Sequence, residues 1–199
     1  MAITVVGTPV AANATSVGIT IPAGTKLLVA GYLSCPYGGM TITGFTCGVD
    51  TLSALTGGGQ AGIYYKKNPT PGTVTLAYTY TDGYNRGIFG VCFTGGHLVI
   101  TGSAEADKSI TVATRVGDWL VGSHGDGTEQ LDGSTPATAL LDIYYDPGSG
   151  LRGNLNAGYL QAVDVSTAWT VTGGGTVYNE TAVARIREES VGNQIMWIA

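Results

Sequence analysis

The sequence predicts an all-β protein built from short antiparallel strands, and two observations support this. Glycine and threonine make up 59 of the 199 residues, and β-branched and aromatic runs alternate with Gly, Pro, Asn and Asp. Strands favour Val, Ile, Thr and Tyr, whereas turns favour Gly and Asn. Since a sandwich of this length can form one core, we expect a single domain over residues 1–189 and a tail over residues 190–199.

The first half contains the clearest strand patterns. Thr73–Tyr80 alternates with period two, which predicts one face made of Val74, Leu76, Tyr78 and Tyr80. Ile88–Phe93 is almost fully apolar, as in a central strand, and we expect it to pair antiparallel with Thr73–Tyr80. Further strands are expected at Ile3–Val6, Val17–Ile21, Lys26–Leu33, Thr41–Cys47 and Ala61–Lys66.

The second half repeats this theme with wider loops. Residues 124–136 read as a long polar loop, and Leu98–Ile100 as a short apolar strand beside His97, which we expect to cap a turn. Residues 176–187 are ambiguous: residues 181–189 fit a helix on propensity, but Ala182, Ala184 and Ile186 share one strand face, which favours a closing strand. Other strands are expected at Ser109–Thr114, Asp118–Val121, Leu140–Tyr145, Ala157–Val163 and Trp169–Val171.

Two segments have similar composition. Gly62-Ile63-Tyr64-Tyr65 and Asp142-Ile143-Tyr144-Tyr145 both precede a Pro-Gly turn. A duplicated half would explain this similarity, but the flanking residues do not align. We therefore interpret the two segments as strands in similar environments.

The chain carries little charge. Charged residues make up 12% of it, the net charge is −5 and the pI is about 4.8. An acidic chain without a basic cluster is not expected to bind nucleic acid, and no apolar run is long enough to span a membrane. Globular domains usually contain about 25% charged residues, so the neutral surface favours packing against other copies or a larger assembly. A secreted or extremophile β-domain is the alternative explanation.

Cysteines and the N-terminus indicate the compartment. Cys35, Cys47 and Cys92 each lie in or beside an apolar run, as buried thiols do. A Cys35–Cys47 disulfide would leave the third thiol unpaired, and no CxxC motif or nearby His indicates zinc. The N-terminus has no secretion-signal pattern, so we expect synthesis in a reducing host cytoplasm.

The densest polar cluster consists of Asp118, His124, Asp126, Glu129 and Asp132. Such residues in one loop could bind a metal ion or perform acid–base chemistry. The spacing matches neither an EF-hand nor HExxH, and Asp-Gly turns favour a solvated loop instead. A phosphate-binding loop and the Gly-x-Ser-x-Gly motif are also absent from the sequence. We therefore assign no catalytic, cofactor-binding or metal-binding residue.

Aromatic and tail residues are the candidates for an interface. In a strand, one member of each tyrosine pair should face the core and the other should face outward. Outward aromatic side chains can anchor a protein interface or stack on sugars. An apolar tail would dock on the domain or on a neighbouring subunit. The candidates are Tyr64, Tyr65, Tyr84, Tyr144, Tyr145, Met196 and Trp197.

Several segments occur in an order that resembles a β-sandwich type of tailed-phage virions. These are Leu27-Leu28-Val29-Ala30, the Tyr64-to-Leu76 region with its Pro-Gly turn, and Gly90-Val91-Cys92-Phe93-Thr94-Gly95. Gly117-Asp118-Trp119-Leu120-Val121 and Ala182–Ile186 resemble its later strands. The resemblance implies a jelly-roll-like sandwich in a virion structural protein, either a head decoration (cement) protein or a tail-fibre module.

These observations together predict a non-enzymatic virion protein. We expect it to decorate or cement a capsid through contacts with the major capsid protein and with copies of itself, arranged as a trimer or another symmetric cluster. The alternative is a tail-fibre or receptor-binding module that recognises host glycans. An enzyme such as a glycan hydrolase is a third hypothesis and would need two carboxylates across a cleft.

Overall fold

A computed structural model describes residues 2–35, 41–81, 85–105, 109–126, 131–135, 138–145, 153–173 and 180–189. The regular elements of these ranges are β-strands in four antiparallel sheets, which confirms the all-β antiparallel prediction. Within the same ranges, no helix has the length and apolar character needed to cross a membrane.

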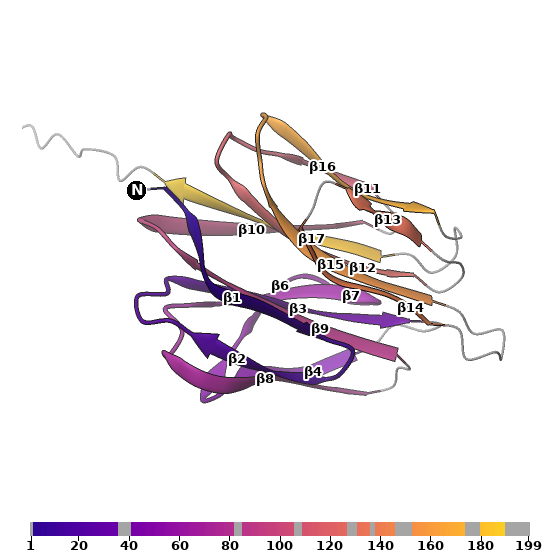
Figure 1. Cartoon of the computed structure of the whole chain (residues 1–199), viewed down its shortest axis with the longest axis horizontal. Coiled ribbons are helices and arrows are strands. Elements are labelled where there is room, and N and C mark those ends of the chain that lie inside the picture. The colour runs from indigo at the N-terminus through magenta and orange to yellow at the C-terminus, as the bar shows by residue number, and fades with distance from the viewer. Residues whose placement is uncertain are drawn as a thin grey trace, which may run out of the picture.

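The first half of the chain, residues 4–94, forms a large and a small sheet (Figure 1). The large sheet has the order β1 (Thr4–Ala12), β9 (Asn85–Thr94), β3 (Leu27–Cys35), β7 (Ala61–Lys67) and β6 (Ser53–Gly57). The small sheet has the order β2 (Ser16–Ile21), β8 (Gly72–Thr81), β4 (Thr41–Cys47) and β5 (Asp50–Thr51).

The second half, residues 97–189, also forms a large and a small sheet. The large sheet has the order β10 (His97–Glu105), β17 (Glu180–Glu189), β12 (Trp119–Asp126), β15 (Gly153–Gln161) and β14 (Thr138–Tyr145). The small sheet has the order β11 (Ser109–Ala113), β16 (Ser166–Gly173) and β13 (Leu131–Thr135).

The two halves have the same strand order. In the large sheets, the strands that occupy equivalent places are β1 and β10, β9 and β17, β3 and β12, β7 and β15, and β6 and β14. In the small sheets, β2, β8 and β4 are equivalent to β11, β16 and β13. The turns that lead into β3 and β12 also match, because each has a glycine at its third position with φ of +85° (Gly24) or +92° (Gly117). The chain therefore contains one sandwich arrangement twice, where a single sandwich was expected.

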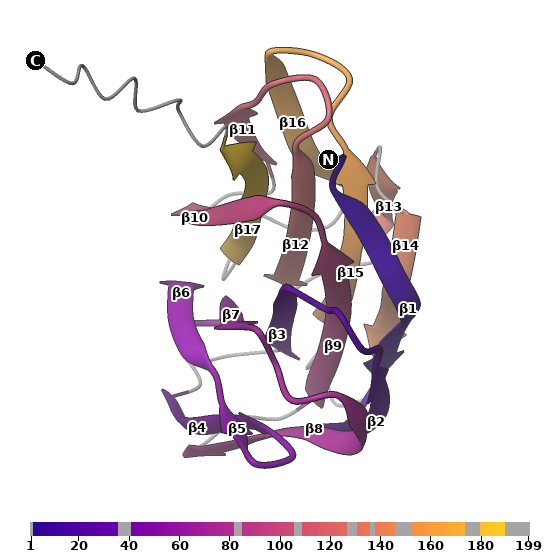
Figure 2. The same cartoon turned by 90° about the vertical axis from the view of Figure 1, so that its left-hand side faces the viewer.

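The two large sheets pack face to face, so that the molecule has four layers (Figure 2). The contacts between them are reciprocal: β1 packs on β14 as β6 packs on β10, and β3 packs on β15 as β7 packs on β12. This is the pattern of a two-fold interface between equivalent subunits, here within one chain.

The core between the large sheets is continuous across both halves. Val29, Phe89 and Val91 of the first half lie in the same buried cluster as Val121 and Ala184 of the second half. Across this interface the rings of Phe93 and Trp119 lie 5.9 Å apart. Because each large sheet is also covered by its own small sheet, its central strands, such as β3, β9 and β12, are buried on both faces over most of their length.

A carboxylate adds a polar connection between the halves. Glu180 at the start of β17 accepts hydrogen bonds from the backbone N–H groups of Gly58 and Ala61, both at 3.1 Å. These two residues flank the hairpin between β6 and β7. The second half thus orders a loop of the first.

Each sandwich has its own second core. The first contains Phe45, Leu76, Tyr78 and other buried side chains between β2-β8-β4-β5 and the large sheet. The second is smaller and is built around Trp169, which is fully buried. A Cβ atom on Gly122 would lie 2.6 Å from the Trp169 ring, so glycine is required beneath it.

Most sequence expectations for individual strands are confirmed. Leu76 and Tyr78 of β8 are buried on the face that Val74 and Tyr80 share, and β9 is a central strand. The segment that ends at Glu189 is a strand in its described part, and Ala182, Ala184 and Ile186 face one core.

Three expectations are wrong. β8 and β9 do not pair, because the chain crosses from the small to the large sheet between them. The expected polar loop over residues 124–136 contains the end of β12 and strand β13. His97 begins β10, where it pairs with Glu189, instead of capping a turn.

The similar segments at residues 62–65 and 142–145 are not equivalent. They lie in β7 and β14, whereas the counterpart of β7 is β15 and that of β14 is β6. The repeated arrangement is therefore real, but this local similarity does not reflect it. The two outer cores are filled with different side chains, so the repeated strand arrangement cannot be recognised from the amino-acid sequence.

Candidate functional site

The polar cluster expected from the sequence is divided between two ends of β12. Asp118 directly precedes the strand and His124 lies near its other end. Six residues of extended chain separate them by roughly 20 Å. Asp126 and Asp132 lie at strand positions whose side chains are not described, and Glu129 lies outside the described residues. In the described ranges, no three His, Cys, Asp or Glu side chains are arranged to hold a metal ion.

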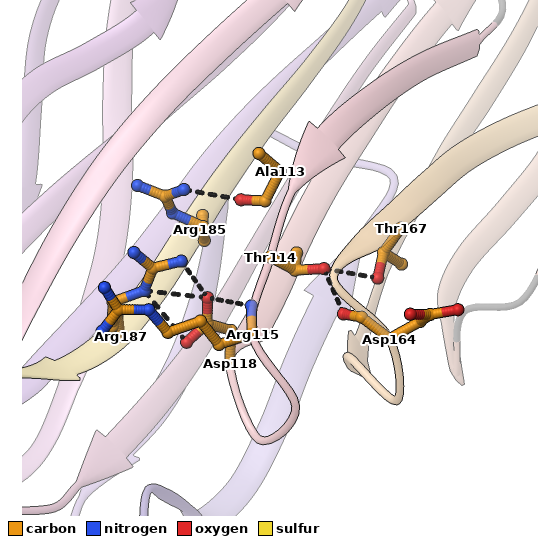
Figure 3. Close-up of polar contacts among 8 residues, drawn as sticks. All are labelled: Ala113, Thr114, Arg115, Asp118, Asp164, Thr167, Arg185 and Arg187. Carbon is orange, nitrogen blue, oxygen red and sulfur yellow. Dashed lines mark hydrogen bonds and ion pairs between the residues drawn. The ribbon is translucent and has the colours of Figure 1, made fainter.

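Asp118 connects a turn to the last strand (Figure 3). Its carboxylate accepts hydrogen bonds from Nε and Nη2 of Arg187 at 3.0 and 2.8 Å, and from the backbone N–H of Arg115 at 2.9 Å. The Asp118 side chain is only 5% exposed and that of Arg187 18%. A paired fork of this kind fixes both side chains, so Asp118 has a clear structural role.

His124 belongs to a row of polar residues that is buried except at Asp142, which is exposed. The row runs through Asp142, Asn156, His124 and Thr181, which are direct neighbours on β14, β15, β12 and β17. His124 Nδ1 and Thr181 Oγ1 are 2.8 Å apart. His124, Asn156 and Thr181 have no exposed surface, so solvent does not reach this part of the row.

The first half shows what the fold requires at the same positions. By register, Gly57, Gly62, Tyr32 and Ile88 correspond to Asp142, Asn156, His124 and Thr181. The Tyr32 ring there packs on the rings of Tyr64 and Tyr78 in an aromatic core. The polar row is therefore a property of the second half, not of the strand arrangement.

The tyrosines expected to face outward do not do so in β7. Tyr64 faces the small sheet of the first half, with its ring 4.8 Å from Phe45, and Tyr65 packs against the core between the large sheets. The side chains alternate as expected, but both faces of this sheet are covered. Tyr144 and Tyr145 lie in β14, where side chains are not described, and Tyr84, Met196 and Trp197 lie outside the described residues.

An exposed apolar group occurs at the end of the second half. Val116, Val163 and Val165, together called the valine tip, are 73%, 85% and 70% exposed. They lie on two loops, residues 114–118 and 162–165. Sequence reasoning missed them, although an apolar residue inside a turn sequence such as Arg115-Val116-Gly117-Asp118 is the signal that could have indicated them.

Hydrogen bonds hold the two loops of the valine tip together (Figure 3). Thr114 N–H donates to the Val165 carbonyl at 2.9 Å, and its hydroxyl donates to the Asp164 carbonyl at 2.6 Å. Gly117 N–H donates to Ala162 O at 2.9 Å. The valines are thus presented by an ordered support, and a partner would lose little conformational freedom of these loops.

A pocket of about 270 Å³ lies beside the valine tip. Its walls include Ile3 near the N-terminus, Val116, Arg115 and Arg187. Polar and apolar groups therefore meet at one end of the molecule, and this combination is typical of a protein-binding surface.

The described cysteines are buried thiols, as the sequence predicts. Cys47 and Cys92 are free and lie in the core between the sheets of the first half, so the possible Cys35–Cys47 disulfide is not formed. Burial raises the pKa of Cys47 to about 11, with a smaller effect of Asp50. Burial, followed by the neighbouring Cys47, raises the pKa of Cys92 to about 12.

These pKa shifts predict how the thiols react and how stability varies with pH. In a Cys35→Ser protein, Cys47 and Cys92 should not react with a disulfide reagent at pH 8 until the protein unfolds. Above pH ~8.5 the unfolded thiols ionise while the folded ones keep their protons, so the free energy of unfolding should fall as pH rises. Rapid reaction of both thiols in the folded protein would contradict their burial.

No protein family matches the chain, and no curated protein or solved structure is significantly similar to it. The function we propose therefore rests on the chain's own sequence and geometry.

Proposed function

We propose that this protein is a non-catalytic structural component of a virion, which decorates a tailed-phage capsid by protein–protein contact at the valine tip. The observation that carries this proposal is the exposure of three apolar side chains on hydrogen-bonded loops. Ordered apolar groups at one end of a weakly charged molecule are suited to being covered by another protein.

The strand order supports the jelly-roll-like fold that the resemblance implies. Apart from the two-residue β5, the described residues of the first half form eight strands distributed between two sheets. Jelly rolls are likewise double sheets of eight strands. In both halves, strands adjacent in sequence repeatedly fall in opposite sheets, as between β1 and β2 or between β8 and β9.

The four-layer structure also suits a decorating role. Both large sheets are covered on both faces, and the two sandwiches share a core. Such a molecule presents its partner with a rigid body, so little conformational entropy opposes binding. Tyr64 and Tyr65 are packed in cores and give no support to the glycan-binding alternative.

Serine substitutions at the valine tip test the proposal. A Val116→Ser/Val163→Ser/Val165→Ser protein should bind shells assembled without the protein at least about tenfold more weakly, because it loses apolar area that binding would bury. Co-sedimentation with shells, together with the heat resistance that the protein confers on them, measures this effect.

The control is Val49→Ser. Val49 is 88% exposed and lies in the turn between β4 and β5, on the outer sheet of the first half. The control removes the apolar side chain of one exposed valine away from the tip, so its binding should equal that of the wild type, whereas the single variant Val163→Ser should already bind more weakly. Equal binding of the triple variant, or wild-type protein that neither binds nor protects shells but adheres to glycans, would overturn the proposal.

A further inference from the structure

The valine tip lies where the last described strand ends. β17 runs antiparallel to β12, so that Ile186 lies beside Trp119 and the next residues pass the start of β12. Glu188 then lines the same pocket as Val116, and the strand ends one residue later. Figure 2 shows the arrowhead of β17 at the same end of the molecule as the loops between β11 and β12 and between β15 and β16. Residues 190–199 therefore begin beside the valine tip.

Residues 190–199 contain no charged side chain, and positions 195–198 form an apolar run of Ile, Met, Trp and Ile. A segment of this length can extend over about 33 Å. The path to the tip is short, because Val116 shares the pocket with Glu188 and hydrogen bonds join the two loops of the tip. The segment is therefore long enough to reach all three valines.

The first half shows that the two loops do not need valine. Their counterparts are the turn of residues 22–25 and the four-residue connection of residues 68–71, which matches residues 162–165 in length and in its first hydrogen bond. The three valines are replaced there by one alanine and two prolines, Ala23, Pro69 and Pro71. Pro69 is buried, whereas Val163 at the corresponding position is 85% exposed. The exposed valines are thus not a requirement of the strand arrangement, which points to a contact made by their side chains.

Covalent attachment favours the molecule's own segment as the group that makes this contact. A segment joined to the body beside its binding surface acts at an effective concentration of roughly 1 mM, above the micromolar concentrations at which separate copies meet. Because residues 190–199 contain no charged side chain, covering the valines with them desolvates no charged side chain of the segment. A preference of about tenfold for the covered state corresponds to about 1.4 kcal/mol, which a few apolar contacts supply.

We infer that residues 190–199 fold back over the valine tip of their own molecule in the free protein, and that the shell protein displaces them on binding. The segment then keeps the ordered apolar side chains of free copies from joining to one another. It releases the tip where a partner that binds more tightly is present. The inference rests on the proposed function, because it adds a regulation of the same contact surface.

Thiol labelling at position 163 tests the inference. In a Cys35→Ser protein the remaining native thiols are buried, so Val163→Cys supplies one reporter at the tip. It should react with a disulfide reagent about tenfold more slowly in the 199-residue protein than in a protein that ends at Glu189, because the segment covers it. The control is Val49→Cys, which lies away from the tip, and its labelling rate should not depend on the segment. Equal rates for Val163→Cys in the two proteins would overturn the inference.

Substitutions within the segment separate the effect of its apolar run from that of its length. Met196→Ser/Trp197→Ser should raise the labelling rate of Val163→Cys nearly to that of the shortened protein, because the apolar contacts are lost. The control Asn193→Ser/Gln194→Ser keeps the apolar run and should label as slowly as the unsubstituted segment. The slow rate should stay constant over about a hundredfold range of protein concentration. Protection that grows with concentration would assign the segment to a neighbouring copy and contradict its folding back.

Shell binding shows which proposal has failed. The protein that ends at Glu189 should bind shells about tenfold more tightly than the 199-residue protein, since no segment has to be displaced. Equal shell affinity of the two proteins would refute the displacement. Segment-dependent protection in a protein that never binds shells would keep the covering contact and refute the virion role. Loss of shell binding on serine substitution of the valines, in a protein whose labelling does not depend on the segment, would refute the covering contact alone.

Discussion

Replacing Trp169 with alanine should destabilise the protein by about 3 to 5 kcal/mol. Trp169 is fully buried and is the largest side chain in the core between the two sheets of the second half. Its ring lies over Gly122, which has no side chain to fill the space that alanine would leave. Urea unfolding followed by circular dichroism measures the loss, since tryptophan fluorescence is altered by the substitution.

Trp169→Phe is the matched comparison. Phenylalanine keeps much of the ring and removes an indole N–H that has no acceptor among the described residues. It should therefore cost less than about 1.5 kcal/mol. A loss below about 1 kcal/mol for Trp169→Ala would mean that the second small sheet does not depend on this side chain.

Replacing Ala184 with aspartate should destabilise both halves together. Ala184 is fully buried in the core between the large sheets, opposite Val121 on the neighbouring strand. An unpaired carboxylate there would cost at least about 3 kcal/mol. Because the two halves share this core, a charge placed in the second half should also unfold the first.

The distribution of two residue types permits a direct measurement of this coupling. All three cysteines, Cys35, Cys47 and Cys92, lie in the first half, and the tryptophans Trp119, Trp169 and Trp197 lie after it. Thiol reactivity and tryptophan fluorescence should change at the same urea concentration, and Ala184→Asp should lower both midpoints equally. The control Thr111→Asp, at an exposed position of β11, should shift neither. A fluorescence transition that moves alone would show that the halves unfold separately.

Local patterns predicted most strands because each depends on adjacent residues. The alternation of Val74, Leu76, Tyr78 and Tyr80 reports one buried face wherever the strand lies in the fold. Sheet membership depends instead on distant segments, and for this reason the pairing of β8 with β9 was predicted wrongly. The polar character of residues 124–136 concealed strands, since His124 is polar and yet fully buried.

The candidate site was less predictable for a related reason. Asp118 and His124 are close in sequence, but an extended strand carries them to opposite ends of the sheet. Val116 and Val163 are distant in sequence. Their loops lie side by side because one precedes β12, the other follows β15, and these two strands are paired neighbours. Arg115 and Arg187 are likewise distant in sequence, although both contact the Asp118 carboxylate in the structure.

The position of the valine tip in an assembled particle tests the central claim most directly. A photo-crosslinking amino acid at position 163, or at position 49 as the control, can be introduced into the protein as particles assemble. We expect position 163 to cross-link to the shell protein and position 49 to give no such product. Cross-links from position 49 alone, or none from position 163 in particles that contain the protein, would contradict the claim.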